Sequence, residues 1–155
     1  MKTLKIISAP RRKLTGILIP TAAALCIVLL AGVLGRSCGG DPPNGKTEEE
    51  RLAYIRSLGW EAKTVPAEEK QILLPEDFPE VLLTYNESQR EAGFDLTRYA
   101  GKVVTMYTYE LTNYPAQGEV LCTLYVYRGR IIGGDIHSTS FTGFLKPLHT
   151  AEDVK

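Results

Sequence analysis

The fold is decided by the stretch Glu119-Val-Leu-Cys-Thr-Leu-Tyr-Val-Tyr-Arg-Gly-Arg-Ile-Ile-Gly-Gly-Asp-Ile136. Residues 120, 122, 124 and 126 are apolar and fall on one face of an extended chain, and the residues between them fall on the other. Arg128-Gly129 supplies a tight hairpin connection, so residues 131–136 return as the last strand. The two glycines within that strand indicate a bulge or a close backbone approach. The stretch therefore predicts an antiparallel hairpin that ends a β-meander.

The residues before this hairpin predict one more meander strand and two helices. Residues 102–113 alternate as a strand, and a turn at residues 114–118 joins it to the hairpin. Thr47-Glu-Glu-Glu50 is a capping box that begins a helix ending at Gly59, and Asp77-Phe-Pro79 begins a second helix ending at Gly93. Residues 61–65 and 71–74 suggest short strands between the helices. The predicted fold is α+β, with two helices packed on one face of a four- to five-stranded antiparallel sheet.

The N-terminal part of the chain has a different composition. Residues 14–34 are 21 uncharged residues, which is long enough for a helix to cross a bilayer. Five cations precede this run and only Arg36 follows it closely, so the positive-inside rule places the N-terminus in the cytoplasm. The predicted organisation is a basic cytoplasmic tail (1–13), a transmembrane helix (14–34), a linker (35–46) and an extracytoplasmic domain (47–150).

A cleaved secretory signal is the competing interpretation of the same run, although the apolar region of such a signal is usually shorter. In both interpretations the C-terminal domain lies outside the cytoplasm. From residue 37 onward there are 18 acids and 12 Lys and Arg residues, a net charge of −6. An acidic body argues against nucleic acid as a partner, because phosphate binding needs a basic face on the folded part.

One polar cluster suggests chemistry in the last strand. Asp135 and His137 point to the same side of an extended chain, where a carboxylate can orient an imidazole. With Cys122 on the neighbouring strand, a small hydrolase or thiol enzyme is the alternative function. A nucleophilic thiol needs an electropositive setting, however, and this domain is acidic. The opposing interpretation leaves Asp135 and His137 on a solvent face or at a turn, and the sequence offers no metal-ligand spacing and no cofactor motif.

Tyrosines on adjacent strands are the remaining feature of the sequence. Tyr107 and Tyr109 lie on one predicted strand, and Tyr125 and Tyr127 lie on the next. An uncovered face bearing them would suit a peptide, glycan or protein partner. The favoured interpretation is core and cross-strand packing, because tyrosine is a common half-buried strand residue.

Several short motifs together resemble the domain of unknown function 4830 family. They are residues 51–60 (RLAYIRSLGW), 74–78 (LPEDF), 85–89 (YNESQ), 93–96 (GFDL), 107–109 (YTY) and 131–136 (IIGGDI). The resemblance extends over residues 50–148 and implies a bacterial, membrane-anchored or exported protein with a shared fold and no assigned activity. It also suggests that residues 85–89 and 133–135 border a common groove.

We therefore expect a noncatalytic binding or interaction module of the bacterial cell envelope, tethered by a single membrane pass. Its partner would be an envelope protein, a peptide or a glycan. A structural accessory of envelope or spore assembly is a further alternative. The candidate binding residues are Tyr85, Asn86, Gln89, Tyr107, Tyr109, Tyr125, Tyr127, Asp135 and His137.

Overall fold

The computed structural model describes residues 41–154, so the predicted tail, transmembrane helix and first part of the linker lie outside the described residues. No helix within residues 41–154 has the length and apolar character needed to span a bilayer. The elements, in chain order, are α2 (Glu48–Ser57), β1 (Glu68–Leu73), α3 (Glu80–Glu91), the 3₁₀ helix η1 (Leu96–Tyr99), β2 (Val103–Leu111), β3 (Val120–Tyr127), β4 (Arg130–Ser138), β5 (Leu145–Pro147) and the 3₁₀ helix η2 (Ala151–Val154).

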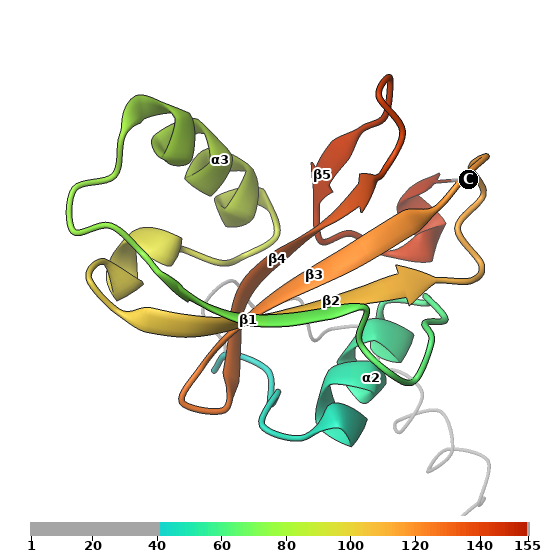
Figure 1. Cartoon of the computed structure of the whole chain (residues 1–155), viewed down its shortest axis with the longest axis horizontal. Helices are drawn as coiled ribbons and strands as arrows, with labels where there is room; N and C mark the ends of the chain where they lie inside the picture. Colours follow the sequence, from blue (N-terminus) through green and yellow to red (C-terminus); the bar gives the residue numbers. More distant parts are fainter. Residues whose placement is uncertain (1–40, 155) are drawn as a thin grey trace, which may run out of the picture. The chain divides into compact units, whose positions relative to one another are not determined.

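The five strands form one antiparallel sheet in the order β1-β2-β3-β4-β5 (Figure 1). This confirms the α+β class, the meander and a sheet of five strands. The strand predicted at residues 61–65 is reduced to a single bridge between Ala62 and Leu111. In its place the sheet gains β5, which pairs with β4 over residues 135–137.

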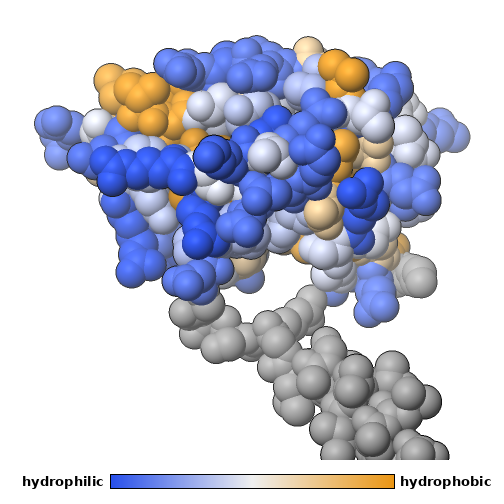
Figure 2. Space-filling view, turned by 90° about the horizontal axis from the view of Figure 1, so that it is seen from below, coloured by the Kyte–Doolittle hydropathy of each residue, from blue (hydrophilic) through white to orange (hydrophobic). Residues whose placement is uncertain are grey.

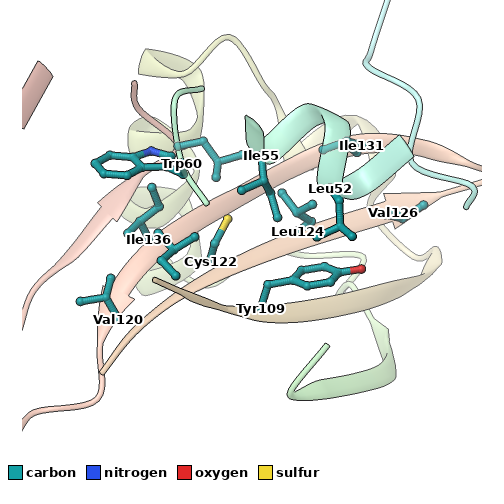
Figure 3. Close-up of a cluster of buried hydrophobic side chains, with 12 residues drawn as sticks. Leu52, Ile55, Trp60, Tyr109, Val120, Cys122, Leu124, Val126, Ile131 and Ile136 are labelled. Atoms are coloured by element: carbon teal, nitrogen blue, oxygen red, sulfur yellow. The ribbon is translucent and has the colours of Figure 1, made fainter. Parts of the chain in front are cut away.

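The two helices lie on opposite faces of the sheet, α2 below it and α3 above it in Figure 1. Leu52 and Ile55 of α2 point at Cys122 and Leu124 of the sheet (Figure 3), and Trp60 belongs to the same cluster. A second buried cluster on the α3 side contains Leu74, Leu96, Val104 and Ile132. The prediction that both helices share one face is wrong, because β3 and β4 carry apolar or aromatic side chains on both faces and each face must be covered.

Local signals at the helix ends act as the sequence predicts. The Thr47 side chain accepts a hydrogen bond from the Glu50 backbone N–H, and the Glu50 carboxylate accepts one from the Thr47 backbone N–H, which completes the capping box. Gly59 and Gly93 follow the two helices with φ of 84° and 85°, the left-handed conformation that glycine adopts without a Cβ clash.

The last residues of the predicted linker are bound to the β3–β4 hairpin. The Ile131 N–H donates to Pro43 O at 2.8 Å, and the Gly45 N–H donates to Gly129 O at 3.0 Å. Arg130 Nη1 donates to the Asn44 side chain at 2.6 Å. The folded domain therefore begins before residue 47, and its first residues are fixed at one end of the sheet. Seen from the α2 side, the surface is mainly hydrophilic, with apolar areas in separate patches (Figure 2).

Candidate functional site

A hydrogen-bonded group of side chains surrounds Asp135 on the α3 face. Asp135 is only 4% exposed. Its Oδ2 accepts a hydrogen bond of 2.6 Å from the Tyr85 hydroxyl, and its Oδ1 lies 2.7 Å from His137 Nδ1. The Tyr125 hydroxyl lies 3.4 Å from that of Tyr85. We call Tyr85, Tyr125, Asp135 and His137 the Asp135 cluster.

Two features of the local sequence assemble this cluster. Strand alternation places Asp135 and His137 on the same side of β4, as predicted. Helix α3 supplies Tyr85 and is fixed to the strand by Gln89, whose side-chain amide exchanges two hydrogen bonds with the backbone of Gly134. Tyr85 and Gln89 therefore lie in contact with Asp135 and Gly134 of β4, and a common groove between the two segments stays a prediction.

The phenols of the cluster stay protonated. Burial raises the pKa of Tyr85 far above its ordinary value, and the negative charge of Asp135 raises it further. Burial also raises the pKa of Tyr125. Tyr85 is therefore a hydrogen-bond donor to the Asp135 carboxylate over the whole physiological pH range.

The imidazole of His137 is oriented by this carboxylate. A ring nitrogen that faces a carboxylate oxygen carries the proton, so Nδ1 is the donor to Asp135. The His137 side chain is 29% exposed, whereas that of Asp135 is 5% exposed. The cluster therefore offers a positioned imidazole at the surface, able to form a hydrogen bond through Nε2.

Cys122 does not join this cluster. In the β3–β4 register it lies opposite Ile136, and its side chain is fully buried in the α2-side core (Figure 3). Asp135 and His137 alternate to the other face. Burial, followed by the charge of Asp135, raises the pKa of the thiol well above its usual range. The alternative of an active site built from Cys122, His137 and Asp135 is therefore wrong, because strand alternation separates the thiol from the other two groups.

The tyrosines of β2 and β3 do not form one surface. Tyr107 and Tyr109 face α2, where the Arg51 guanidinium lies 3.6 Å from the centre of the Tyr107 ring and Arg51 Nε donates to the Tyr109 hydroxyl at 2.8 Å. Tyr125 and Tyr127 belong with the cluster on the α3 side. The favoured prediction of core and cross-strand packing is confirmed. A shared aromatic face is wrong, since Tyr109 pairs with Cys122, not with Tyr125.

Asn86 and Tyr127 have structural surroundings. Asn86 is buried, donates to Asp95 Oδ1 at 2.9 Å and accepts from the Leu96 N–H at 2.7 Å, which fixes the turn after α3. The Tyr127 ring packs edge-on against Tyr99 with 5.6 Å between centroids. Neither side chain has a partner in the Asp135 cluster.

A residue that no sequence pattern indicated lies beside His137 on the neighbouring strand. Leu145 of β5 pairs directly with His137 and is 57% exposed, so it forms an apolar rim at the imidazole. Its strand has three residues and contains Pro147, which argues against a strand except at a sheet edge. No group of three or more His, Cys, Asp or Glu side chains within residues 41–154 is arranged as metal ligands are.

Comparison with known proteins assigns the chain to a family without an assigned activity. The family described as Domain of unknown function (DUF4830) matches residues 54–136, from within α2 to β4. No curated protein and no solved structure matches the chain. The matched segment holds Tyr85, Gln89 and Asp135 and ends one residue before His137. Since the match spans more than half of the 155 residues, the chain belongs to the DUF4830 family.

Proposed function

We propose that the protein is a noncatalytic binding module of the bacterial cell envelope, held outside the cytoplasm by its N-terminal segment, and that its ligand contacts His137. The observation that carries this proposal is the Asp135 cluster. A nearly buried carboxylate and a protonated phenol hold an imidazole in one orientation at the surface.

The cluster is suited to recognition. Its polar groups fix the position of His137, and the nucleophile that the sequence suggested lies in the core of the opposite face. Leu145 adds exposed apolar surface next to the imidazole. A ligand with a hydrogen-bonding group beside an apolar group would match both, which favours a peptide or an envelope protein as partner. A preformed polar contact with an apolar rim is the usual composition of a specific binding site.

The tether is supported by the sequence. The uncharged run of residues 14–34 is long enough to span a bilayer, and the cations before it favour a cytoplasmic N-terminus. This orientation would place the folded domain and the Asp135 cluster at the outer surface of the membrane.

Binding is tested with immobilised domain (residues 41–155) and detergent extracts of the envelope, with bound components quantified by mass spectrometry. We expect a component that binds the wild-type domain and is lost with His137→Gln. Lys63→Gln, on an exposed residue without contact to the cluster, is the matched control and should retain it. Turnover of ester, peptide or glycoside substrates that disappears with His137→Gln would instead make the protein an enzyme.

Topology is tested separately, with an epitope tag after residue 155 in intact protoplasts. External protease should remove the tag. A tag that stays protected until the cells are lysed would overturn the extracytoplasmic placement.

A further inference from the structure

The chain enters the folded domain at the end of the sheet that carries the β3–β4 hairpin, where hydrogen bonds fix its position. Apolar and basic side chains are exposed at the same end. We define the hairpin end as residues 42–46, 102–103 and 127–131 together with Leu73. We infer that the hairpin end lies against the anionic headgroups of the membrane in which the N-terminal segment sits. This inference rests on the tether of the proposed function.

The chain between the uncharged run and the folded domain has a short reach. Residues 43–45 are fixed to Gly129, Arg130 and Ile131 by the hydrogen bonds described above. Only residues 35–42 separate the uncharged run from this fixed segment. Eight residues span at most about 29 Å, which is less than the roughly 35 Å breadth of a domain of this size. The hairpin end is therefore the part of the domain held closest to the bilayer.

Apolar side chains are exposed at this same end. In the register, the last residue of β1, Leu73, pairs with the first residue of β2, Val103. Leu73 is 67% exposed and Val103 is 54% exposed, although both are strand residues. Thr105 pairs with Val126, which brings the start of β2 next to the end of β3 and its hairpin. Apolar residues beside a membrane can enter the boundary between headgroups and acyl chains.

The hairpin itself is locally basic. The hairpin sequence Tyr127-Arg-Gly-Arg-Ile131 has two cations and no acid, and Lys102 is exposed at the start of β2. The Arg128 guanidinium lies 5.2 Å from the centre of the Tyr127 ring, which joins a cation to an aromatic side chain of the type enriched at membrane interfaces. Glu76, close to Gly101, and Glu50, whose Oε2 accepts from the Lys46 N–H at 2.8 Å, are acids at this end. The chain from residue 37 onward has a net charge of −6, so cations concentrated at the hairpin would orient an acidic domain on an anionic surface.

This orientation also places the Asp135 cluster away from the bilayer. Strand β4 runs from Arg130 at the hairpin end to Ser138 at the other end, and His137 lies near its far end. His137 lies seven residues further along the strand than Arg130, a rise of about 23 Å. The imidazole would then face outward, where an envelope partner can reach it.

The test uses the full chain in lipid nanodiscs of phosphatidylcholine, with or without phosphatidylglycerol, that contain a gadolinium-chelating lipid. Paramagnetic broadening of backbone amide NMR signals reports proximity to the headgroups. In the anionic discs we expect stronger broadening at Val103 and Gly129 than at Thr142 and Gly143 of the β4–β5 turn. We expect the difference to shrink in discs of phosphatidylcholine alone.

Single substitutions measure what the cations contribute to membrane docking, separately from the tether. Lys102→Gln and Arg128→Asn should each lower the ratio of docked to undocked domain by roughly fivefold in anionic discs. Lys146→Gln, which removes a cation from β5, should leave the ratio unchanged. Equal broadening at both ends in chains that co-elute with the discs would overturn the inference and leave the tether intact. Chains that elute apart from the discs would overturn the tether, and the inference with it.

Discussion

Gln89 is bound to Gly134 as one backbone peptide is bound to another across a sheet. Gln89 Nε2 donates to Gly134 O at 2.9 Å, and the Gly134 N–H donates to Gln89 Oε1 at 2.8 Å. Strand β5 pairs with β4 only at residues 135–137, so this amide continues the pairing by one residue. The same contact holds α3 at the height where Tyr85, one turn earlier, reaches Asp135.

Replacing Gln89 with Leu should destabilise the domain by roughly 2–5 kcal/mol, because it leaves a buried N–H and a buried C=O without partners. Urea unfolding of residues 41–155, followed by the fluorescence of Trp60, measures the change. Glu87→Ala, on an exposed position of the same helix, is the control and should change stability by less than about 0.5 kcal/mol. Equal stability of the two variants would contradict the assigned role of the amide.

Gly134→Ala should also destabilise the domain, by at least about 2 kcal/mol. A Cβ at this position would lie 2.2 Å from the Thr123 carbonyl oxygen and 2.9 Å from a Leu148 methyl carbon, and the first of these is backbone. Gly93→Ala is the comparison, because no atom lies within 4 Å of its added Cβ and the cost is limited to the positive φ. The urea midpoints of the two variants are compared, and Gly134→Ala should unfold at the lower urea concentration. A Gly134→Ala protein as stable as wild type would rule out the close approach.

Cys122 should be unreactive in the folded domain. It is fully buried and its pKa is raised, so little thiolate forms and no reagent reaches it. Cys122 is the single cysteine of the chain from residue 41 onward, so a thiol-reactive chromophore reports on it alone. We expect no labelling in buffer near pH 8 and complete labelling in denaturant. Rapid labelling of native protein would show that the thiol is accessible after all.

Asp95 should make stability depend on pH in the acid range. Partial burial acts to raise the pKa of its carboxyl, but hydrogen bonds from Thr97, Asn86 and Arg90 outweigh it and lower that pKa to about 2. Because the folded value lies below the ordinary 3.8, the ionised carboxylate stabilises the fold above about pH 4. That contribution is lost as the pH falls towards 2.

Comparison of wild type with Asp95→Asn isolates this effect. At pH 7 the variant should be less stable by at most about 1 kcal/mol, since the side chain is partly exposed to solvent. The difference in stability between wild type and variant should disappear as the pH falls from 4 to 2. A gap of the same size at both ends of that interval would show that the ionisation of Asp95 is not responsible.

Arg51 should limit the access of trypsin to residues 43–46 at the start of the domain. Its Nη1 donates to Gly45 O at 3.1 Å and to Lys46 O at 3.3 Å, and its guanidinium lies over the Tyr107 ring. Arg51→Met should release residues 43–46, so that trypsin cuts after Lys46 faster than in wild type. Arg56→Met, on an exposed position of the same helix, is the control, and trypsin should cut this variant after Lys46 at the wild-type rate. Mass spectrometry of the fragments over time provides the measurement.

Much of the fold follows from local sequence signals. The capping box at Thr47, the glycines after both helices and the strand alternation around Asp135 act over a few residues and are visible without a structure. The face on which each helix packs is a long-range property. Both faces of β3 are apolar or aromatic, and no local signal says which helix covers which face.

The candidate site was predictable only in part. The shared side of Asp135 and His137 follows from a period of two residues. The separation of Cys122 from them depends on the β3–β4 register, which places Cys122 opposite Ile136. The prediction that Tyr107 and Tyr109 share a face with Tyr125 was wrong for the same reason, which here is the register of β2. Leu145 was missed because a three-residue edge strand has no periodicity to detect.

The attachment of residues 43–45 to the β3–β4 hairpin also determines how a mechanical load would enter the domain. A pull on the N-terminal side would first stretch the hydrogen bonds that the Arg130 guanidinium and the Ile131 N–H donate to the Pro42 and Pro43 carbonyls, and then the bond that the Gly45 N–H donates to Gly129 O, before it reached the helix α2. These bonds join the chain to the β3–β4 hairpin and the start of β4, the strand that also carries Asp135 and His137. Tension would thus be transmitted along the strand that holds the His137 imidazole. Helix α2 and its capping box would carry no load until these hydrogen bonds broke.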